Sequence, residues 1–353
     1  MSLSLRSVRI PELNDSLQNR WRGIQQVNSD WLSPLLGPDY AVLVGTHRRD
    51  SRVAIIEQDD QPVGFLPYHD LGRGKAIPIG GQLSDLQAIV TQPGISVDAN
   101  WFMRNLGLRV LHFDHLLTNQ EHFANHIRMV DDAAVIDINE DTKRYFHRLE
   151  QNSKSFWKQM NRKRRQLARD IGPLRFELHC ADATLLQSSI DWKQQQLKQQ
   201  GLQDSLREQW VRDLAHSMQI HLSDSTRGLL STLWAGDTPV ATHLGLLGNG
   251  ILNSWIPAHN IKLAKYSPGA LLHLDLIAEA PRLGIRRIDL GRGVNRLKSR
   301  LMTRAIPLGI GSIDLRRFSR LGTSLWYQCR QLADSHPMLE RALAIYRRLR
   351  YQT

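Results

Sequence analysis

The residues best suited to chemistry lie in one stretch, and the first group reads Lys265-Tyr266-Ser267-Pro268-Gly269-Ala270. Proline is favoured at the first position of a helix, and glycine leaves the backbone bare beside it. Free N–H groups at Gly269 and Ala270, together with the helix dipole, would attract an anion such as a phosphate, and Lys265 adds positive charge. Without its context the same sequence is equally an ordinary helix start.

A second group is Asp289-Leu290-Gly291-Arg292-Gly293, followed by Lys298. Asp289 ends an expected strand, and a carboxylate can accept a proton from an amine if burial raises its pKa. The alternative for Asp289 is a helix N-cap or an ion pair with Arg292. We expect Lys298 to hold a phosphate or carboxylate rather than to act as a base.

Two further side chains complete the candidate catalytic set. His243 lies in the middle of an expected strand, and an imidazole that is neutral near pH 7 is the best general base by intrinsic pKa. A lone histidine in a strand is also commonly a structural residue of the core. Tyr266 could act as a general acid toward a leaving group.

The elements around these residues form one compact unit. The sequence predicts strands at 228–235, 240–247 and 251–256, and Asn249-Gly250 is a strong hairpin signal between the last two. After a polar loop the apolar period changes from 2 to 3.6, which predicts a helix that starts at Pro268 and ends between Pro281 and Gly284. A short strand follows at 287–291.

This order of elements, with Ser-Pro-Gly at 267–269 and Asp-x-Gly-x-Gly at 289–293, resembles GNAT-fold acyltransferases of the CelD-like (cellulose and exopolysaccharide biosynthesis) family, which is related to Fem-type aminoacyltransferases. That family usually has an aromatic residue before its lysine, whereas Leu297 precedes Lys298 here. The strict GNAT pyrophosphate signature is also absent, and the resemblance implies that Ser267-Pro268-Gly269 takes its place.

The resemblance implies an α/β protein of two GNAT-like (acyl-CoA N-acyltransferase) halves, each a mixed, mostly antiparallel sheet flanked by helices. We expect an N-terminal half at 1–138, a C-terminal half with the active site at 139–318, and a basic helical tail at 319–353. Turn–Pro–Val recurs at 60–63 and 237–240, each time before a strand, which favours an internal duplication.

The implied activity is transfer of an acyl group, acetyl in the simplest case, from acyl-CoA to an amine or hydroxyl of a sugar- or peptide-linked acceptor in exopolysaccharide or cell-envelope biosynthesis. No metal is implied. In this interpretation the donor-binding residues are Lys265, Ser267, Gly269 and Ala270, and the catalytic residues are His243, Asp289, Lys298 and Tyr266. Two alternatives remain open: an aminoacyl-tRNA-dependent, Fem-like aminoacyltransferase, and a non-catalytic GNAT-fold scaffold of a polysaccharide synthase.

Charge separates these alternatives only in part. The chain carries a formal net charge of +12, which favours an acidic partner such as nucleic acid, anionic lipid or a phosphate-bearing donor. Much of this charge lies at 141–170, where apolar residues at near-heptad spacing predict one long amphipathic helix with a run of cations at 162–165. That face is either simply solvated or binds the phosphates of a cofactor or a tRNA.

The remaining features set limits. No apolar run approaches the length of a membrane span, and the first twenty residues lack the apolar core of a secretory signal. Two cysteines form no metal pattern, and His122 and His126, four residues apart, have no persuasive third ligand nearby. We therefore expect a cytoplasmic protein, with peripheral contact to the anionic inner membrane face through the basic tail as an alternative.

Overall fold

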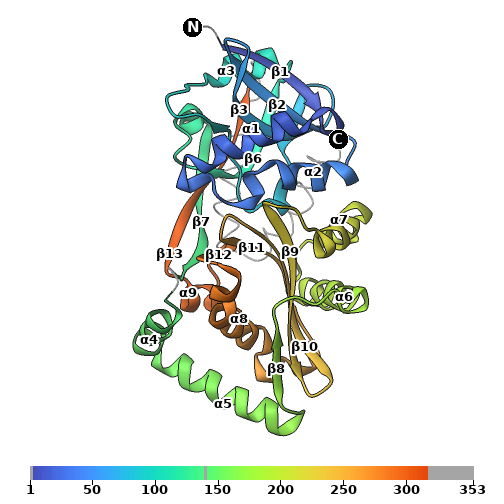
Figure 1. Cartoon of the computed structure of the whole chain (residues 1–353), viewed down its shortest axis with the longest axis vertical. Coiled ribbons are helices and arrows are strands. Elements are labelled where there is room, and N and C mark those ends of the chain that lie inside the picture. Colours follow the sequence, from blue (N-terminus) through green and yellow to red (C-terminus); the bar gives the residue numbers. More distant parts are fainter. Residues whose placement is uncertain (1–2, 139–140, 317–353) are drawn as a thin grey trace.

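The computed structural model describes residues 3–138 and 141–316 (Figure 1). Within these residues thirteen strands form one continuous sheet, in the order β1-β2-β3-β4-β6-β13-β7-β12-β11-β10-β9-β8, with β5 paired to β3 outside this path. The chain is thus a mixed α/β protein, as the resemblance implied. The predicted tail at 319–353 lies outside the described residues.

The first half begins with a strand and two helices and continues with the strands of its sheet. Its elements are β1 (Leu3–Arg9), α1 (Asp15–Gln26), α2 (Pro38–His47), β2 (Ser51–Gln58), β3 (Gln61–Asp70), β4 (Lys75–Pro78), η4 (Gly81–Leu83), β5 (Val90–Thr91), α3 (Ala99–Asn105), β6 (Val110–Leu117) and β7 (Ile127–Asp137). The predicted boundary at residue 138 follows directly after β7.

The second half repeats this order after two helices. Its elements are α4 (Thr142–Asn152), α5 (Lys154–Asp170), β8 (Leu174–Glu177), α6 (Ala183–Gln200), α7 (Gln209–Ile220), β9 (Thr226–Ala235), β10 (Thr238–Gly248), β11 (Ile251–His259), η7 (Ile261–Tyr266), α8 (Pro268–Glu279), β12 (Arg287–Arg292), α9 (Arg296–Leu301) and β13 (Arg304–Asp314).

The two halves share one sequence of elements, strand–helix–helix–three strands–helix–strand. It runs β1-α1-α2-β2-β3-β4-α3-β6 in the first half and β8-α6-α7-β9-β10-β11-α8-β12 in the second. In both, the last two strands pair in parallel, β4 with β6 and β11 with β12, while the hairpins before them are antiparallel. The halves also exchange strands, because β7 pairs with β12, and β13 pairs with both β6 and β7.

Turn chemistry sets the hairpins of the second half. Asn249 and Gly250 both have positive φ, 51° and 74°, the conformation of a type I′ turn that matches the twist of the flanking strands. The predicted strands at 228–235, 240–247 and 251–256 are confirmed within three residues at each end. The predicted helix and the following strand are confirmed as α8 and β12.

The helix predicted over 141–170 is wrong in its continuity. It breaks at Ser153, whose φ of −138° and ψ of 45° are not helical, and forms α4 and α5 instead. Apolar spacing alone missed the break because both helices keep their buried stripe, through Tyr145 and Leu149 in α4 and Met160 and Leu167 in α5.

Three hydrophobic clusters hold the layers together. One is shared by the halves and joins α1 and α2 to α6 and α7 against the sheet. Another packs α4, α5 and α8 against the strands of the second half, and the third packs α3 against the first. Among the described residues, no helix combines the length and apolar character needed to cross a bilayer.

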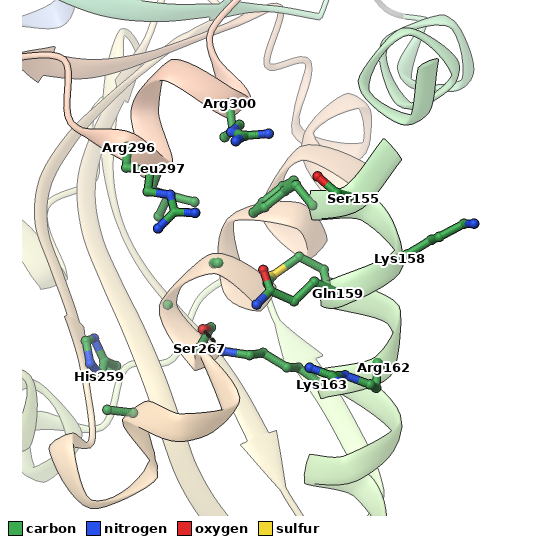
Figure 2. Close-up of a pocket in the computed structure, with 15 residues that line it drawn as sticks. Ser155, Lys158, Gln159, Arg162, Lys163, His259, Ser267, Arg296, Leu297 and Arg300 are labelled. Atoms are coloured by element: carbon green, nitrogen blue, oxygen red, sulfur yellow. Dashed lines mark hydrogen bonds between the residues drawn. The ribbon is translucent and has the colours of Figure 1, made fainter. Parts of the chain in front are cut away.

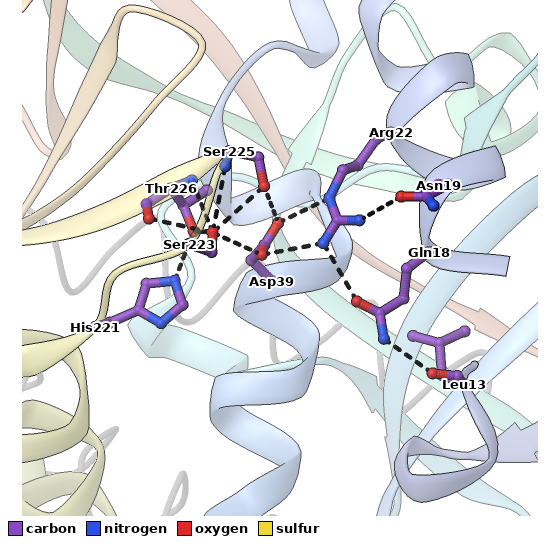
Figure 3. A network of polar contacts seen from close by, with 9 residues as sticks. All are labelled: Leu13, Gln18, Asn19, Arg22, Asp39, His221, Ser223, Ser225 and Thr226. Atoms are coloured by element: carbon purple, nitrogen blue, oxygen red, sulfur yellow. Dashed lines mark hydrogen bonds and ion pairs between the residues drawn. The ribbon is translucent and has the colours of Figure 1, made fainter. Parts of the chain in front are cut away.

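A polar network also fastens the halves to each other (Figure 3). The buried carboxylate of Asp39 on α2 accepts hydrogen bonds from Ser223 and Ser225 of the second half, at 3.1 and 2.8 Å, and from Arg22 on α1. Burial by itself would raise the pKa of Asp39, but the Arg22 and serine donors lower it below its ordinary value.

Candidate functional site

A cavity of about 930 Å³ lies between α5, the N-terminus of α8 and α9 (Figure 2). Of the described residues that line it, five are lysine or arginine and none is acidic: Lys158, Arg162, Lys163, Arg296 and Arg300. Phe156, Met160 and Leu297 add apolar surface. Such a lining suits a ligand with an apolar part and several negative charges.

The N-terminus of α8 opens on this cavity through Ser267, Gly269 and Ala270. Ser267 has a left-handed backbone (φ 53°, ψ 48°), and its Oγ accepts a hydrogen bond of 2.5 Å from Lys163 Nζ instead of capping the helix. The expected pair of free amides is reduced to one, because Ala270 N–H donates to Ser267 O at 3.0 Å. The structure therefore leaves the Gly269 N–H as the free amide at this helix start.

His259, at the end of β11, also lines the cavity and was missed by the sequence analysis. Gln196 Nε2 donates both to His259 O, at 3.0 Å, and to His259 Nδ1, at 2.8 Å. Because a carbonyl oxygen can only accept, the amide orientation is fixed and Nδ1 must also accept. The neutral imidazole therefore carries its proton on Nε2 and offers a donor, not a base.

The cations at 162–165 divide into separate roles. Arg162 and Lys163 line the cavity, whereas Arg164 forms an ion pair of 2.5 Å with Asp275 of α8 and fixes α5 against it. Arg165 is exposed. Burial, and then the charge of Arg162, lowers the pKa of Lys163. Of the four cations in this run, only Arg162 and Lys163 are therefore placed to contact a phosphate in this cavity.

The sheet opens next to the cavity. β11 and β12 pair only through Ile251–Asn253 and Arg287–Asp289, although both strands continue beyond that point. The register of β10 against β11 also shifts between Leu244 and Gly245. Two parallel strands that separate in this way leave a V-shaped opening in the sheet, with the end of β11 on one side and the end of β12 on the other.

Lys298 and the glycine-rich turn after β12 meet at this opening. Lys298 Nζ donates to the carbonyl oxygens of Gly291, at 3.0 Å, and Arg292, at 2.8 Å. Burial lowers the pKa of Lys298. The lysine of the Asp-x-Gly-x-Gly…Lys pattern therefore holds the backbone of the turn, which the sequence analysis did not foresee.

Asp289 is buried within an ion pair. Arg287 donates to both of its carboxylate oxygens, with a distance of 3.0 Å from Nη2 to Oδ2. The salt-bridge alternative was right in kind, but the partner is Arg287 and not Arg292. Burial raises the pKa of Asp289 more than Arg287 lowers it. A carboxylate bound at both oxygens has little capacity left for a substrate proton, so its catalytic role stays a prediction that this geometry does not favour.

His243, Tyr266 and Lys265 do not reach the cavity. His243 is fully buried, its Nε2 contacts Ser254 Oγ at 2.8 Å, and burial followed by the nearby His273 lowers its pKa to about 3. Tyr266 is buried and its hydroxyl donates to Asp170 at 2.9 Å, while Lys265 lies over the Tyr266 ring at 4.8 Å. The roles predicted for these three residues stay predictions.

Comparison with known proteins agrees with this architecture. Residues 154–299, from α5 to α9, match the family model described as acetyltransferase (GNAT) domain. A search of curated protein sequences found no match.

Solved structures share the fold at low identity. One is the C-terminal domain of a proposed lysylphosphatidylglycerol synthetase from Agrobacterium fabrum, with 13% identity, a TM-score of 0.50, and coverage of 85% of this chain and 91% of that one. Another is L-PGS from Bacillus licheniformis, with 9% identity, a TM-score of 0.50, and coverage of 87% of this chain and 94% of that one. A third is FemX, with 8% identity, a TM-score of 0.50, and coverage of 77% of this chain and 89% of that one. Residues 154–299 thus match a GNAT acetyltransferase domain, and all of the residues that line the cavity except Arg300 lie within this match.

Proposed function

We propose that this protein transfers an acyl group from acyl-CoA to an amine or hydroxyl of a sugar- or peptide-linked acceptor. The observation that carries the proposal is the cavity at the start of α8, where a helix N-terminus and five cationic side chains converge beside the opening of the sheet. Helix N-termini bind phosphate groups through free N–H groups and the helix dipole. CoA presents such phosphates together with a long uncharged arm.

The residues divide the work of holding this donor. The Gly269 N–H and the cations of α5 and α9 face the place where a diphosphate would lie, with Lys163 already held against Ser267. The Nε2–H of His259 supplies a neutral donor farther along β11. The separated edges of β11 and β12 offer unpaired backbone groups to an uncharged, amide-bearing chain.

The first half has no comparable phosphate site at the helix start that corresponds to the N-terminus of α8. Its equivalent of α8 is α3, seven residues long, and the N-cap there is Asp98, whose carboxylate accepts from Trp101 N. A carboxylate at a helix start occupies the amides that a phosphate would need and repels a second anion. We therefore assign donor binding to the second half alone.

The assignment to a biosynthetic process and to a narrower family rests on the resemblance at 267–269 and 289–298. On that basis we place the reaction in exopolysaccharide or cell-envelope biosynthesis, in a CelD-like protein of the cytoplasm or the inner membrane face. Tyr266, His243 and Lys265 are supporting residues of this site in the proposal, behind the surface that Ser267 and Gly269 present.

An aminoacyl-tRNA donor is the second candidate, and the exposed face of α5 favours it. Lys154, Arg165 and Arg169 are all exposed along one helix, and they extend the positive surface beyond the cavity. A tRNA would use the whole helix, whereas CoA would use only its cavity side.

Calorimetric titration with acetyl-CoA and free CoA, at low and moderate salt, tests the proposal. We expect micromolar binding that Gly269→Trp abolishes, because a Cβ at Gly269 points toward His259, 3.5 Å away, and a larger side chain fills the cavity. Gly23→Trp is the matched control, since Gly23 is a helical glycine with open space around it. No binding by the wild-type protein at either salt would exclude acyl-CoA and leave aminoacyl-tRNA or a scaffold role.

A further inference from the structure

A group of ionisable side chains from both halves meets at the opening between β11 and β12, outside the cavity described above. The first half supplies Asp85, from the segment after η4, and Asp114 and His115 from β6. The second half supplies Lys193 from α6, Arg292 from β12 and Lys298 from α9. Neither half builds this group alone.

Asp85 lies at its centre. His115 Nε2 is 3.8 Å from Asp85 Oδ1, and the backbone N–H of Arg292 donates to the carboxylate. A Cβ on Gly291 would come within 2.3 Å of Asp85 Oδ2, so the glycine at this position, with φ 79°, makes room for the carboxylate. The Asp85 side chain is nevertheless 23% exposed.

The imidazole ring of His115 is oriented by Asp114, and the backbone of His115 by Gln87. Its Nδ1 contacts Asp114 Oδ1 at 2.8 Å, and Gln87 Oε1 accepts from the backbone N–H groups of both Asp114 and His115. Because the carboxylate of Asp114 can only accept, Nδ1 carries a proton and Nε2 is turned toward Asp85. Asp114 and His115 are both buried, and a carboxylate that fixes the tautomer of a histidine is a recurrent arrangement in proton transfer.

Lys193 connects this group with the donor cavity. Burial lowers the pKa of Lys193, the charge of Lys298 lowers it further, and Asp85 raises it. The charge of Lys193 also contributes to lowering the pKa of His259, which lines the cavity. The Lys193 side chain is thus within electrostatic range of both Asp85 and His259.

We propose that Asp85, supplied by the half to which we assign no donor binding, is the general base of the transfer, held by the backbone of Gly291 and Arg292 with His115 beside it. The acceptor nitrogen or oxygen attacks the thioester carbonyl carbon, the new C–N or C–O bond forms, and the C–S bond breaks. The acceptor proton moves to Asp85, and the CoA thiolate takes up a proton from the site to leave as the thiol. This inference rests on the proposed function.

Asp85 suits the role better than the bases expected from the sequence. Both oxygens of Asp289 are engaged by Arg287, and His243 is fully buried. Burial raises the pKa of Asp85, against the opposing effects of His115, Lys298 and Arg292. A carboxylate with a raised pKa is a stronger base than an exposed one.

The test measures donor binding and proton transfer separately. Acetyl-CoA affinity is measured by calorimetry, and CoA release is followed with a thiol reagent, with hydroxylamine as a small acceptor kept at constant concentration of its unprotonated form. For Asp85→Asn we expect donor affinity within twofold of wild type and a loss of transfer of at least about 100-fold, in the usual range for a general base. Asp85→Glu should recover part of the rate.

Asp131→Asn is the matched control. Asp131 also lies near Arg292, at 3.5 Å, but it is on β7 and its side chain is 44% exposed. This variant should transfer at the wild-type rate. The wild-type rate should also rise with pH through a pKa above the ordinary value for aspartate, and Asp85→Asn should abolish that rise. The charged groups that face Asp85 and shape this profile are His115, Lys193, Asp289, Arg292 and Lys298.

Each outcome decides the inference. Transfer by Asp85→Asn within threefold of wild type would overturn it, and so would loss of donor binding in that variant, which would make Asp85 part of the donor site. A wild-type protein that binds acetyl-CoA but releases no CoA above the uncatalysed rate also contradicts it. Absence of acetyl-CoA binding in the wild type is a separate failure, that of the proposed function itself.

Discussion

Replacing Lys158 and Arg162 by glutamine should weaken acetyl-CoA binding without changing the fold. Both residues are among those that line the cavity, and both are exposed, so removing their charges leaves no buried partner uncompensated. Exposed charge pairs contribute about 0.2–1 kcal/mol each, and a concave lining with five cations and no acidic residue places this pair toward the upper end. The double variant should therefore lose about 1–2 kcal/mol, or roughly 5- to 30-fold in Kd.

The control comes from the same helix. Lys154→Gln/Arg165→Gln removes the same charge from exposed positions of α5 that do not line the cavity. Calorimetric titration at several salt concentrations measures both pairs. For a donor bound in the cavity, the control pair should keep the wild-type Kd within twofold and the cavity pair should show a smaller dependence of Kd on salt.

Equal losses in the two pairs would refute the cavity assignment. They would show that the helix acts as a long-range positive surface, as expected for a polyanion that covers its whole length. The same four variants can be titrated with aminoacyl-tRNA. A tRNA donor should then lose affinity with both pairs and show a salt slope that falls with each cation removed.

Three further predictions address the site and its supports. Asp289→Asn leaves Arg287 buried without its partner and should reduce the free energy of unfolding by about 3–5 kcal/mol in chemical denaturation, whereas a loss below about 1 kcal/mol would contradict a structural ion pair. Gly291→Ala should abolish hydroxylamine transfer but retain acetyl-CoA binding, because its Cβ would displace the Asp85 carboxylate at 2.3 Å; retained transfer would contradict this packing. Asp39→Asn should destabilise the protein by about 1–3 kcal/mol at pH 7 through weakened bonds to Arg22, Ser223 and Ser225. Because the folded pKa of Asp39 is lowered, its stabilisation is present above the unfolded pKa and is lost as pH falls through the folded one, so the difference between wild type and variant should shrink in acid.

Local patterns in the sequence predicted the second half well. The Asn249-Gly250 turn, the change of period before Pro268 and the short strand at 287 each depend on neighbouring residues, and each is present. The start of α8 at Pro268 was also predicted, and it lines the cavity through Gly269 and Ala270. What local pattern could not show was that Ala270 N–H is used by Ser267 O, since that depends on the left-handed backbone of Ser267.

The residues missed from the sequence are those whose roles depend on distant contacts. The tautomer of His259 is set by Gln196, which is 63 positions away in the sequence. The local signal for His259 was only its place at the end of a strand before a polar loop. Asp85 lies more than 200 positions before Gly291 and carries no motif. His115 carries no local signal of its contact with Asp85, because the segment of Asp85 is brought to it by the bridge between Gln87 and Leu116.

The exchange of strands gives a structural role to the first half, to which we assign no donor binding. β7 lies between β12 and β13, so the strand that ends at the glycine-rich turn is supported by the first half along one edge. Asp114 O accepts from Arg292 Nη1 at 2.8 Å, and Asp132 O accepts from Gly293 N–H at 2.9 Å, so the turn itself is held by first-half backbone on two sides. Lys298 closes it from the second half. A turn held at fixed distance from Asp85 preserves the geometry that proton transfer needs, since a displacement of about 1 Å in a reacting group can reduce a rate by about 100-fold.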